Sequence, residues 1–403
     1  PSWGLDRIDQ RDLPLDQRYT YRTKGSSVLA YVIDTGIRIT HTTFGGRAIW
    51  GTNTTGDGID TDCNYYGHGT HVAGTIGGAE YGVAKGVTLV AVKVLGCDGS
   101  GSLAGVVAGV DWVTGHHQIG KPAVANMSLG ANGHFDVLED AVRNSIADGI
   151  VYTIASGNSN IDACNVSPAR VTEAITVNAS TINDLRASYS NWGTCTDIFA
   201  PGDEIVSASN ASDTAFASLR GTSMAAPHVA GAAALLLDQN ALLTPSQVTL
   251  AILRAATPNK IPNPGTGSPN RLLFTGASLA PSPIFTTLAR FSWPGVDRLS
   301  STTHPGGRYE IEDKLGVIAT TPVSGTIALY QCSAGADYFT SIRPDCEGQT
   351  YRGVIGYAYR TPPSDISPAL YRCLSIRTGD RFDSTEPSCE GQQLEGRLGY
   401  LSE

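Results

Sequence analysis

Residues 220–237 read RGTSMAAPHVAGAAALLL, and this stretch decides which kind of fold the chain adopts. From Val229 to Leu237 it is apolar on almost every side, which is typical of a helix in the middle of a large domain. Ser223 stands at the start of the expected helix, where free backbone N–H groups and the helix dipole favour negative charge. A serine in this position is either an N-cap or a nucleophile beside an anion site. The segment alone favours the cap, so the choice depends on the rest of the chain.

The first two thirds of the chain alternate short apolar runs with helical patterns. The runs SVLAYVID, VTLVAVKVLG, GIVYTIASGN and AITVNAS end at Asp34, Gly96, Asn158 and Ser180. Near-continuous apolar runs are typical of parallel strands that are covered on both faces. Helical patterns lie between them, at HGTHVAGTIGG, SLAGVVAGVDWVTGH and DVLEDAVRNSIADG. This order predicts an α/β fold with a doubly wound, mostly parallel sheet, whose ligands bind beyond the carboxyl ends of the strands.

The last third of the chain is built from repeats. The stretch that starts at Ala328 recurs from Ala369, and a fainter copy starts at Ala289. Three copies of short strands and turns predict a small all-β domain with three-fold repetition, for which we favour a β-trefoil. Two prolines in SLAPSPIF interrupt the pattern before the first copy. We therefore expect a first domain at 1–278, a linker at 279–284 and a three-repeat domain at 285–403.

Composition excludes several classes of partner. The chain has 403 residues, 41% of them hydrophobic, and a formal net charge of −9. A long run of Lys and Arg is missing, so we expect neither nucleic acid nor an anionic membrane as a partner. The longest apolar stretch falls short of the roughly 18 residues that a membrane span needs. The chain begins PSWGL, without a methionine or a signal-like segment, as we expect of a processed mature protein.

The cysteines indicate an oxidising compartment. Their number is even and they lack the CxxC spacing of metal sites, so we expect disulfides and secretion. Four of them fall on each side of the proline-containing seam, which lets each domain close its own bonds. The simplest pairs in the second domain are Cys332–Cys346 and Cys373–Cys389, although four cysteines allow three connectivities. The eight are Cys63, Cys97, Cys164, Cys195, Cys332, Cys346, Cys373 and Cys389.

Three short motifs could carry chemistry: VIDTG at Asp34, YGHGTHVAG at His68, and GTS at Ser223. DTG is also the signature of pepsin-like aspartic proteases, but that chemistry needs two carboxylates, and the chain has no second DTG or DSG. His68 and His71 could be metal ligands one helical turn apart, but the HExxH pattern is missing. Together, a carboxylate, a histidine and a serine supply the orienting acid, the base and the nucleophile of acyl transfer. Their order along the chain is that of subtilisin.

These motifs carry a family resemblance. VIDTGI, GHGTHVAGTIGG and GTSMAAPHVAGAAALLL resemble the three active-site blocks of the subtilase family, which implies a subtilisin-like fold over roughly residues 1–276. WGLDRIDQRDLPL resembles the proteinase K branch, especially its aqualysin-like members. By position, the resemblance implies a triad of Asp34, His68 and Ser223, with Asn158 as the side-chain donor of the oxyanion hole. Asp34 would orient His68, His68 would take the Ser223 proton, and Asn158 would stabilise the developing oxyanion.

The resemblance also implies where a substrate peptide binds. The family pairs an extended peptide between two exposed strand edges, which correspond here to Gly99, Ser100 and Gly101 and to Ser128, Leu129 and Gly130. The walls of the pocket for the residue before the scissile bond would be SLGA from Ser128 and ASG at Ala155 to Gly157. These walls carry no acid, so we expect cleavage after aromatic or aliphatic residues rather than after basic ones.

Disulfide pairs and calcium sites follow from the same resemblance. Aqualysin-like members imply Cys63–Cys97 and Cys164–Cys195. Structural Ca²⁺ is the expected ion, since hard oxygen ligands suit it. The acidic loop at Asp57, Asp60 and Asp62 is interpreted as surface charge and not as a calcium site. The expected ligands are Asp6, Asp9, Gln10 and Asp16 at one site, and Asp197 with the carbonyls of Thr172 and Ala174 at another.

The sequence thus predicts a secreted, monomeric serine endopeptidase of broad specificity that acts on proteins and peptides. A propeptide is expected during maturation. A separate three-repeat domain adds nothing to a triad that is complete at residue 223, so we expect it to dock the enzyme on polysaccharide or insoluble protein. One alternative is a binding protein with an inert protease scaffold. Another is an esterase, although esterases of the α/β-hydrolase type use G-x-S-x-G, and Ser223 stands in Gly-Thr-Ser.

Overall fold

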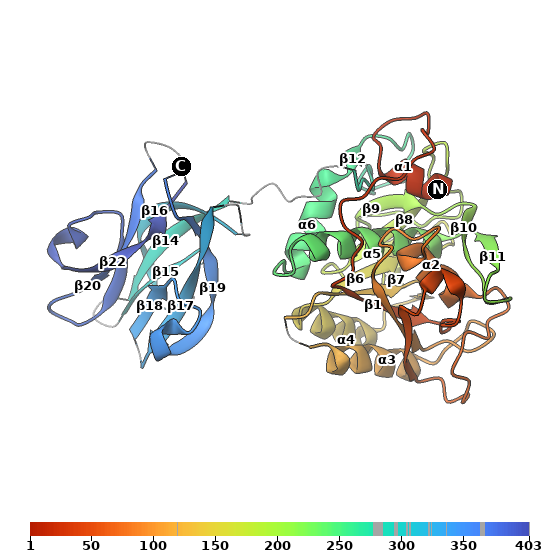
Figure 1. Ribbon diagram of the computed structural model, residues 1–403, viewed down its shortest axis with the longest axis horizontal. Helices are drawn as coiled ribbons and strands as arrows, with labels where there is room; N and C mark the ends of the chain where they lie inside the picture. The colour runs from red at the N-terminus through yellow and green to blue at the C-terminus, as the bar shows by residue number, and fades with distance from the viewer. Residues whose placement is uncertain are drawn as a thin grey trace. The chain divides into compact units, whose positions relative to one another are not determined.

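The computed structural model describes the chain except for residues 119, 277–284, 294–296, 304, 306, 307, 321, 322, 324, 336, 363–366 and 403. The chain divides into two compact units, Pro1–Ala280 and Pro281–Glu403 (Figure 1). The linker expected at 279–284 lies outside the described residues. Among the described residues, no helix combines the length and the apolar character that crossing a bilayer requires.

The first unit is built on a nine-stranded sheet in the order β12-β13-β9-β8-β6-β4-β1-β3-β2. Neighbours from β9 to β2 all run parallel, as does the pair β13 and β9, and only β12 pairs antiparallel with β13. The predicted parallel sheet is therefore confirmed. Its strands are β1 (Leu29–Asp34), β2 (Ala48–Asn53), β3 (Thr88–Lys93), β4 (Ala123–Met127), β6 (Val151–Ala155), β8 (Ile175–Ser180), β9 (Ile198–Pro201), β12 (Thr257–Pro258) and β13 (Arg271–Leu272).

Helices cover both faces of this sheet because its strands are apolar on both sides. On β1, Ala30 and Val32 belong to one core cluster, while Tyr31 and Ile33 belong to another. The first cluster contains residues of α2 (His68–Gly77), α5 (Thr222–Gln239) and α6 (Pro245–Ala255). The second contains residues of α3 (Leu103–His116) and α4 (Asp136–Ala147). The fold is therefore doubly wound.

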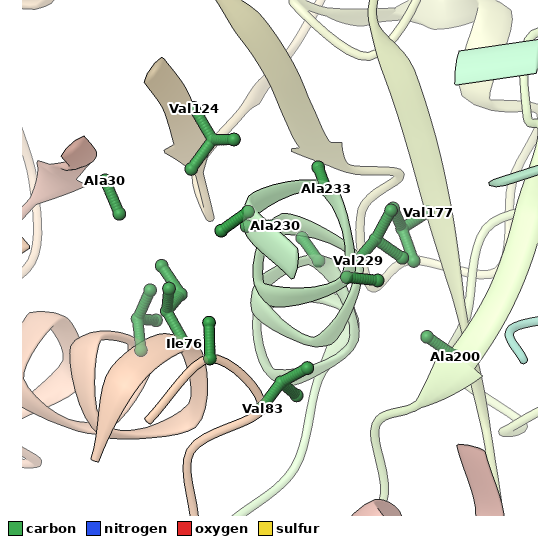
Figure 2. Close-up of a cluster of buried hydrophobic side chains, with 14 of the residues drawn as sticks. Ala30, Ile76, Val83, Val124, Val177, Ala200, Val229, Ala230 and Ala233 are labelled. Carbon is green, nitrogen blue, oxygen red and sulfur yellow. The ribbon is translucent and has the colours of Figure 1, made fainter. Parts of the chain in front are cut away.

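Helix α5 runs through the middle of the first unit, as its sequence predicts. Sixteen of its 18 residues are buried. Figure 2 shows Val229, Ala230 and Ala233 packed among side chains of the strands and of the α2 region, among them Val177 and Ile76. Alanines allow the helix to lie close to the sheet, which fixes the position of its first turn. That first turn carries Ser223.

Shorter elements complete the first unit. α1 (Trp3–Ile8) opens the chain, with the Ser2 hydroxyl accepting a hydrogen bond from Leu5 N at 3.4 Å. Two small antiparallel pairs join β5 (Ala131–Asn132) to β7 (Val166–Ser167) and β10 (Ile205–Ala208) to β11 (Phe216–Leu219).

The second unit is all-β and antiparallel, as predicted. In each repeat the first strand pairs with both of the others, so the repeat is a three-stranded unit. Leucines and other apolar residues from all three repeats form one core, among them Leu288, Leu329 and Leu370. The strands are β14 (Phe285–Trp293), β15 (Asp297–Ser301) and β16 (Glu310–Ala319), β17 (Thr326–Ala334), β18 (Asp337–Ser341) and β19 (Thr350–Tyr359), and β20 (Ala369–Leu374), β21 (Arg381–Ser384) and β22 (Gln393–Tyr400).

A ring of three carboxylates joins the repeats to one another. Asp297, Asp337 and Asp380 come from the same position in successive repeats, and each has a carboxylate oxygen within 4.8 Å of the others. Asp297 accepts a hydrogen bond from the backbone N–H of Tyr338, and Asp337 accepts one from Arg381, both at 3.2 Å. The backbone of Arg298 donates to Asp380 and closes the ring. Each carboxylate therefore binds the backbone of the next repeat.

Four disulfide bonds are present, as expected: Cys63–Cys97, Cys164–Cys195, Cys332–Cys346 and Cys373–Cys389. The last two resolve the connectivity that the sequence left open in the second unit. Each packs against a buried phenylalanine of its own repeat, Phe339 or Phe382.

Candidate active site

Asp34 and His68 meet where β1 ends and α2 begins. Asp34 is fully buried, while the His68 side chain is 25% exposed. The imidazole Nδ1 lies 2.7 Å from Asp34 Oδ1. Since a carboxylate only accepts, Nδ1 carries the proton and donates it, which leaves Nε2 as an acceptor. The backbone N–H of Thr35 also donates to Asp34 Oδ1, at 2.7 Å, and fixes the carboxylate.

The surroundings of His68 favour its protonated form. Burial lowers the pKa of His68, because it disfavours the charged ring. The charge and hydrogen bond of Asp34 oppose this effect, with a further contribution from Asp62. The net result is a pKa of His68 above its ordinary value of 6.5. Asp34 thus stabilises the imidazolium that forms when His68 takes a proton.

Asp62 is part of this arrangement and not a surface charge. It is 5% exposed, so the interpretation of Asp62 as solvated surface is wrong. One carboxylate oxygen accepts hydrogen bonds from the backbone N–H and hydroxyl of Thr70, at 2.9 and 2.6 Å. The other accepts from the Thr35 hydroxyl at 3.0 Å, and that hydroxyl also accepts from Gly69 N at 2.9 Å. Asp62 therefore ties the first turn of α2 to the end of β1. Burial raises the pKa of this carboxyl.

Ser223 lies in the first turn of α5 but does not cap it. The N-cap residue is Gly221, with a φ of 151°, so the interpretation of Ser223 as a cap is wrong. An added Cβ on Gly221 would lie 3.3 Å from Asn158 Nδ2. The Ser223 hydroxyl donates to the carbonyl of Ser128 at 3.2 Å, and no hydrogen bond joins these described atoms to His68. For His68 to accept a proton from Ser223, the hydroxyl would first have to turn away from Ser128.

Asn158 stands beside Ser223 with its amide fixed. Its Oδ1 accepts hydrogen bonds from the backbone N–H and the hydroxyl of Thr222, at 2.8 and 2.9 Å. The Nδ2 group is therefore free to donate elsewhere. Asn158 and Ser223 line the same pocket of about 230 Å³, together with Ala155 and Gly157. None of the described residues that line this pocket is charged.

A buried chain of hydrogen bonds, which the sequence did not predict, ends at the backbone carbonyl of Ser223. Thr153 Oγ1 donates to Asn126 Oδ1 at 3.0 Å, and Asn126 Nδ2 donates to Ser128 Oγ at 2.8 Å. Ser128 Oγ in turn donates to the carbonyl of Ser223 at 2.8 Å. The chain connects β6 and β4 to the start of α5. Its signal in the sequence is a polar residue inside an apolar strand, because such a group needs a partner once it is buried.

The two segments expected to bind substrate face one cleft. This cleft has a volume of about 640 Å³ and also contains His68. The side chains of Leu95, Leu103 and Phe135 contribute apolar surface to the lining of the cleft. The structure therefore brings together all six backbone positions of the two segments, Gly99, Ser100 and Gly101 on one side and Ser128, Leu129 and Gly130 on the other.

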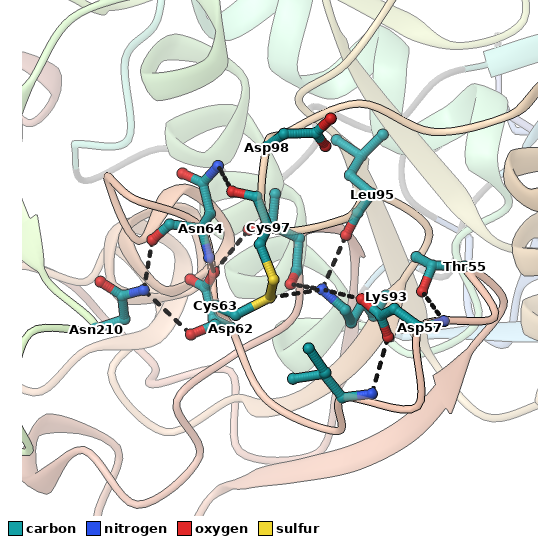
Figure 3. The surroundings of a disulfide bond; sticks show 12 residues. Thr55, Asp57, Asp62, Cys63, Asn64, Lys93, Leu95, Cys97, Asp98 and Asn210 are labelled. Carbon is teal, nitrogen blue, oxygen red and sulfur yellow. Dashed lines mark hydrogen bonds and ion pairs between the residues drawn. A yellow bond between two sulfur atoms is a disulfide. The ribbon is translucent and has the colours of Figure 1, made fainter.

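The disulfide Cys63–Cys97 lies within a polar network that links the His68 loop to the first of these segments (Figure 3). Asn64 Nδ2 donates to the Cys97 carbonyl at 3.1 Å, and Asn64 Oδ1 accepts from the backbone of Tyr66 and of His68 at 3.0 and 3.4 Å. Buried Lys93 donates to the carbonyls of Thr35 and Leu95, both at 3.0 Å. The loop before His68 is thus joined to Cys97 by both the disulfide of Cys63 and the side chain of Asn64.

The residues expected to hold calcium near the N-terminus share one hydrogen-bonded loop, although Asp6, Asp9 and Asp16 do not form a group of carboxylates that all lie within 4.8 Å of one another. Asp6 is buried and accepts from the backbone of Asp16 and Gln17, at 3.2 and 2.7 Å. Gln10 Oε1 accepts from Asp16 N at 3.2 Å. Asp9 has one buried carboxylate oxygen without a hydrogen-bond partner. Burial raises the pKa of Asp9, as do the charges of Asp16 and Asp6, so a bound cation would relieve this repulsion.

Asp197 is the one carboxylate expected at the second calcium site. Asp197 is half-buried, and burial raises its pKa to about 6. Its carboxylate accepts from the backbone of Thr176 at 2.8 Å. Thr172 is exposed and Ala174 is buried. Asp57 lies near Cys63 and Cys97, but both thiols are used in their disulfide.

Known proteins are similar to the first unit of the chain. The profile of the Subtilase family matches residues 25–274. The extracellular serine proteinase of Thermus sp. (strain Rt41A) is 58% identical over 275 residues, which are 68% of this chain and 66% of that protein. The alkaline serine exoprotease A of Vibrio alginolyticus is 52% identical over 274 residues, 68% of this chain and 50% of that protein. The chain thus spans between one half and two thirds of the length of these two relatives.

Solved structures show the same similarity. A cold adapted subtilisin-like serine proteinase superposes with a TM-score of 0.65 and 51% identity, over 68% of this chain and 98% of that one. Proteases from Pseudoalteromonas arctica superpose with a TM-score of 0.58 and 28% identity, over 64% of this chain and 91% of that one. With a family profile matched over more than half of its residues, the chain belongs to the subtilase family.

Proposed function

We propose that the chain is a secreted serine endopeptidase of the proteinase K branch, similar to aqualysin-like members, with Asp34, His68 and Ser223 as its triad. The observation that carries the proposal is the 2.7 Å contact between His68 Nδ1 and Asp34. His68 lines the substrate cleft, and the pocket that Ser223 lines shares the segment from Ser128 to Gly130 with that cleft. Four disulfides support an oxidising compartment and therefore secretion. The chemistry would be acyl transfer from a peptide to Ser223 and then to water.

Each step uses a group whose position is described above. The Ser223 oxygen attacks the carbonyl carbon of the scissile bond while its proton passes to His68 Nε2. The negative charge that develops on the carbonyl oxygen is stabilised by Asn158 Nδ2 and the backbone N–H of Ser223. His68 then gives its proton to the leaving amine, and the C–N bond breaks. A water molecule, deprotonated by His68, releases the acyl group and restores the Ser223 hydroxyl.

Specificity follows from the uncharged pocket beside Ser223. A basic side chain would lose its hydration there and find no carboxylate, which is unfavourable. Aromatic and aliphatic side chains have no comparable hydration to lose, so we propose broad cleavage after such residues. Proteins and peptides are the substrates on this account.

We propose structural Ca²⁺ at the N-terminal cluster, held by Asp6, Asp9, Gln10 and Asp16, and a second ion at Asp197 with the carbonyls of Thr172 and Ala174. The unpartnered oxygen of Asp9 supports the first site better than any observation supports the second. When bound, the ion supplies positive charge and cross-links the loop, and it takes no part in peptide hydrolysis.

Labelling with a serine-directed fluorophosphonate tests the proposal against an inert scaffold. The intact chain should react at one residue, identified by mass spectrometry as Ser223, and it should hydrolyse chromogenic peptides. An unlabelled, correctly folded protein would support the binding-protein alternative instead. Hydrolysis of simple esters without hydrolysis of peptides would support the esterase.

For the second unit we propose a β-trefoil that docks the enzyme on polysaccharide or insoluble protein. Three equal three-stranded units around one apolar core support the fold. A chain truncated after residue 280 should keep its activity on short peptides and lose adsorption to a solid substrate. If the truncated chain also lost its activity on short peptides, the second unit would be needed for the stability of the first unit. We also propose that the protein is a monomer and matures from a form with a propeptide.

A further inference from the structure

Two consecutive tyrosines, Tyr65 and Tyr66, stand exposed next to the catalytic histidine. They are 87% and 62% exposed, respectively. Their ring centroids lie 4.9 Å apart with the planes at 88°, so the rings pack edge to face. Burial of a large aromatic side chain is favourable, so an exposed pair beside a cleft offers surface that a ligand can cover. The pair therefore calls for an explanation by binding.

The backbone that carries the pair is rigid. The Tyr66 N–H donates to Asn64 Oδ1 at 3.0 Å, and Gly67 N donates to the Asn64 carbonyl at 2.9 Å. Asn64 itself is 6% exposed, and its carbonyl accepts from Asn210 at 2.7 Å. Gly67 has a φ of 64°, and a Cβ there would meet Asn210 at 2.6 Å. Little conformational freedom is left to lose when a ligand packs on the rings, which favours binding.

Tyr66 lines two pockets, both of which also contain His68. It lines the cleft of about 640 Å³ that holds the two substrate-binding segments. It also lines a second pocket of about 490 Å³, which contains His68 but none of those segments. The second pocket contains His68 and Met224, the neighbour of Ser223, without the two segments expected to bind the acyl side of the substrate, so we assign it to the leaving-group side. Its other walls include Leu219 and Met224.

The chemistry of the second pocket selects an apolar side chain. Tyr66, Leu219 and Met224 offer apolar surface, and the two charges at the pocket, Glu204 and Arg220, have opposite signs. We infer that Tyr66, whose ring packs edge to face with that of Tyr65, is a specificity-determining residue that recognises a large apolar or aromatic side chain immediately after the scissile bond. This inference rests on the proposed peptidase function and adds a requirement on the leaving-group side of the substrate.

Acyl transfer to added amines isolates this side of the substrate. In the intact enzyme, the acyl group on Ser223 partitions between water and an amino-acid amide, whose amine attacks the ester carbonyl while Ser223 Oγ takes back a proton through His68. We expect phenylalaninamide to compete with water at least tenfold better than glycinamide does. Tyr66→Ser should reduce that preference about tenfold, Tyr65→Ser should reduce it less, and Tyr66→Phe should retain it.

The matched control is Tyr351→Ser, in the second unit. Tyr351 is 53% exposed and its ring lies 6.1 Å from that of Tyr330, so it resembles Tyr66 in exposure and in its aromatic partner. This variant should keep the parent's preference. Thermal melting checks that the Tyr66 variants are folded.

The outcomes separate this inference from the proposed function. If the parent neither hydrolyses peptides nor reacts with a fluorophosphonate, both fall. If the parent is active and Tyr66→Ser keeps the full preference for phenylalaninamide, only the inference falls. It also falls if Tyr66→Ser changes discrimination solely between peptides that differ before the scissile bond, because the rings would then act on the acyl side.

Discussion

Asn158 Oδ1 accepts two hydrogen bonds from Thr222, one from the backbone N–H at 2.8 Å and one from the hydroxyl at 2.9 Å. Because both acceptor sites of this oxygen are used, the amide cannot turn over without losing them. Nδ2 is therefore fixed as a donor at the pocket that Ser223 shares. A donor fixed before the reaction costs no reorganisation when the oxyanion forms.

The first prediction concerns this donor. Asn158→Ala should lower kcat by about 10²–10³ and change KM little, because the hydrogen bond is made to the oxyanion and not to the ground-state carbonyl. Steady-state kinetics on a chromogenic peptide provide the measurement. A variant with unchanged kcat and raised KM would assign Asn158 to ground-state binding.

The pH dependence of activity reports on His68. Only the neutral imidazole accepts the Ser223 proton, so kcat/KM should rise as the pH passes upward through the pKa of His68. Asp34 raises that pKa above 6.5, and the midpoint of the acid limb should lie above pH 6.5 as well. Asp34→Asn should lower kcat by about 10⁴, since the ring loses its tautomer and its counter-charge. A rate that stays flat down to pH 4 is incompatible with a histidine base.

Calcium removal should weaken the fold and spare the chemistry. A ligand that binds only the folded state at 100 times its Kd adds about 2.7 kcal/mol to the free energy of unfolding. EDTA should therefore lower the melting temperature of the first unit, and Asp9→Asn should reduce the difference between EDTA and millimolar Ca²⁺. Asp12→Asn is the control, because Asp12 is 71% exposed, lies in the same loop and pairs with Lys260. Identical melting temperatures of the parent with and without Ca²⁺ would contradict the proposal that the protein binds this ion.

The carboxylate ring makes the stability of the second unit sensitive to pH. Burial raises the pKa of Asp380 to about 7, as do the neighbouring Asp297 and Asp337. The folded unit therefore keeps a proton that the unfolded chain releases above about pH 4. Its free energy of unfolding should fall as the pH rises from about 4 to about 7. Asp380→Asn, which still accepts from Arg298 N, should flatten this fall and raise the melting temperature at pH 8.

Exposed Asp313, in β16 of the same unit, provides the matched control for that change. Asp313→Asn should leave the pH dependence of the second unit as it is in the parent. Equal pH profiles for the parent and for Asp380→Asn would contradict the assignment of the effect to the ring.

The positions of the buried strands could be predicted, because they depend on local runs of apolar residues. The apolar runs that end at Asp34 and Ser180 became β1 and β8, since a strand buried on both faces has to be apolar throughout. The positions of Asp62 and Asn126 could not be predicted in this way. Asp62 is buried because Thr70 and Thr35 satisfy its oxygens, and Asn126 matters because Ser128 and Thr153 lie on either side of it. Such contacts form only after distant segments have packed.

The direction of the Ser223 hydroxyl is likewise a tertiary property. The sequence places Ser223 at the start of an apolar helix, but whether it caps that helix depends on Gly221 and on Ser128, which lies far away in the chain. The three-fold repeat was visible because it is a local similarity. The carboxylate ring was not, because Asp297, Asp337 and Asp380 meet only in the folded unit.

The most direct test of the account is the activity of Ser223→Ala. Among the residues that the structure describes, the hydroxyl bonds the Ser128 carbonyl alone, at the edge of a pocket, so its loss should leave the melting temperature close to that of the parent. The kcat for peptide hydrolysis should fall by a factor on the order of 10⁶, since without the nucleophile only binding and the oxyanion donors contribute. A folded Ser223→Ala protein that hydrolyses peptides at a rate near that of the parent would contradict the mechanism.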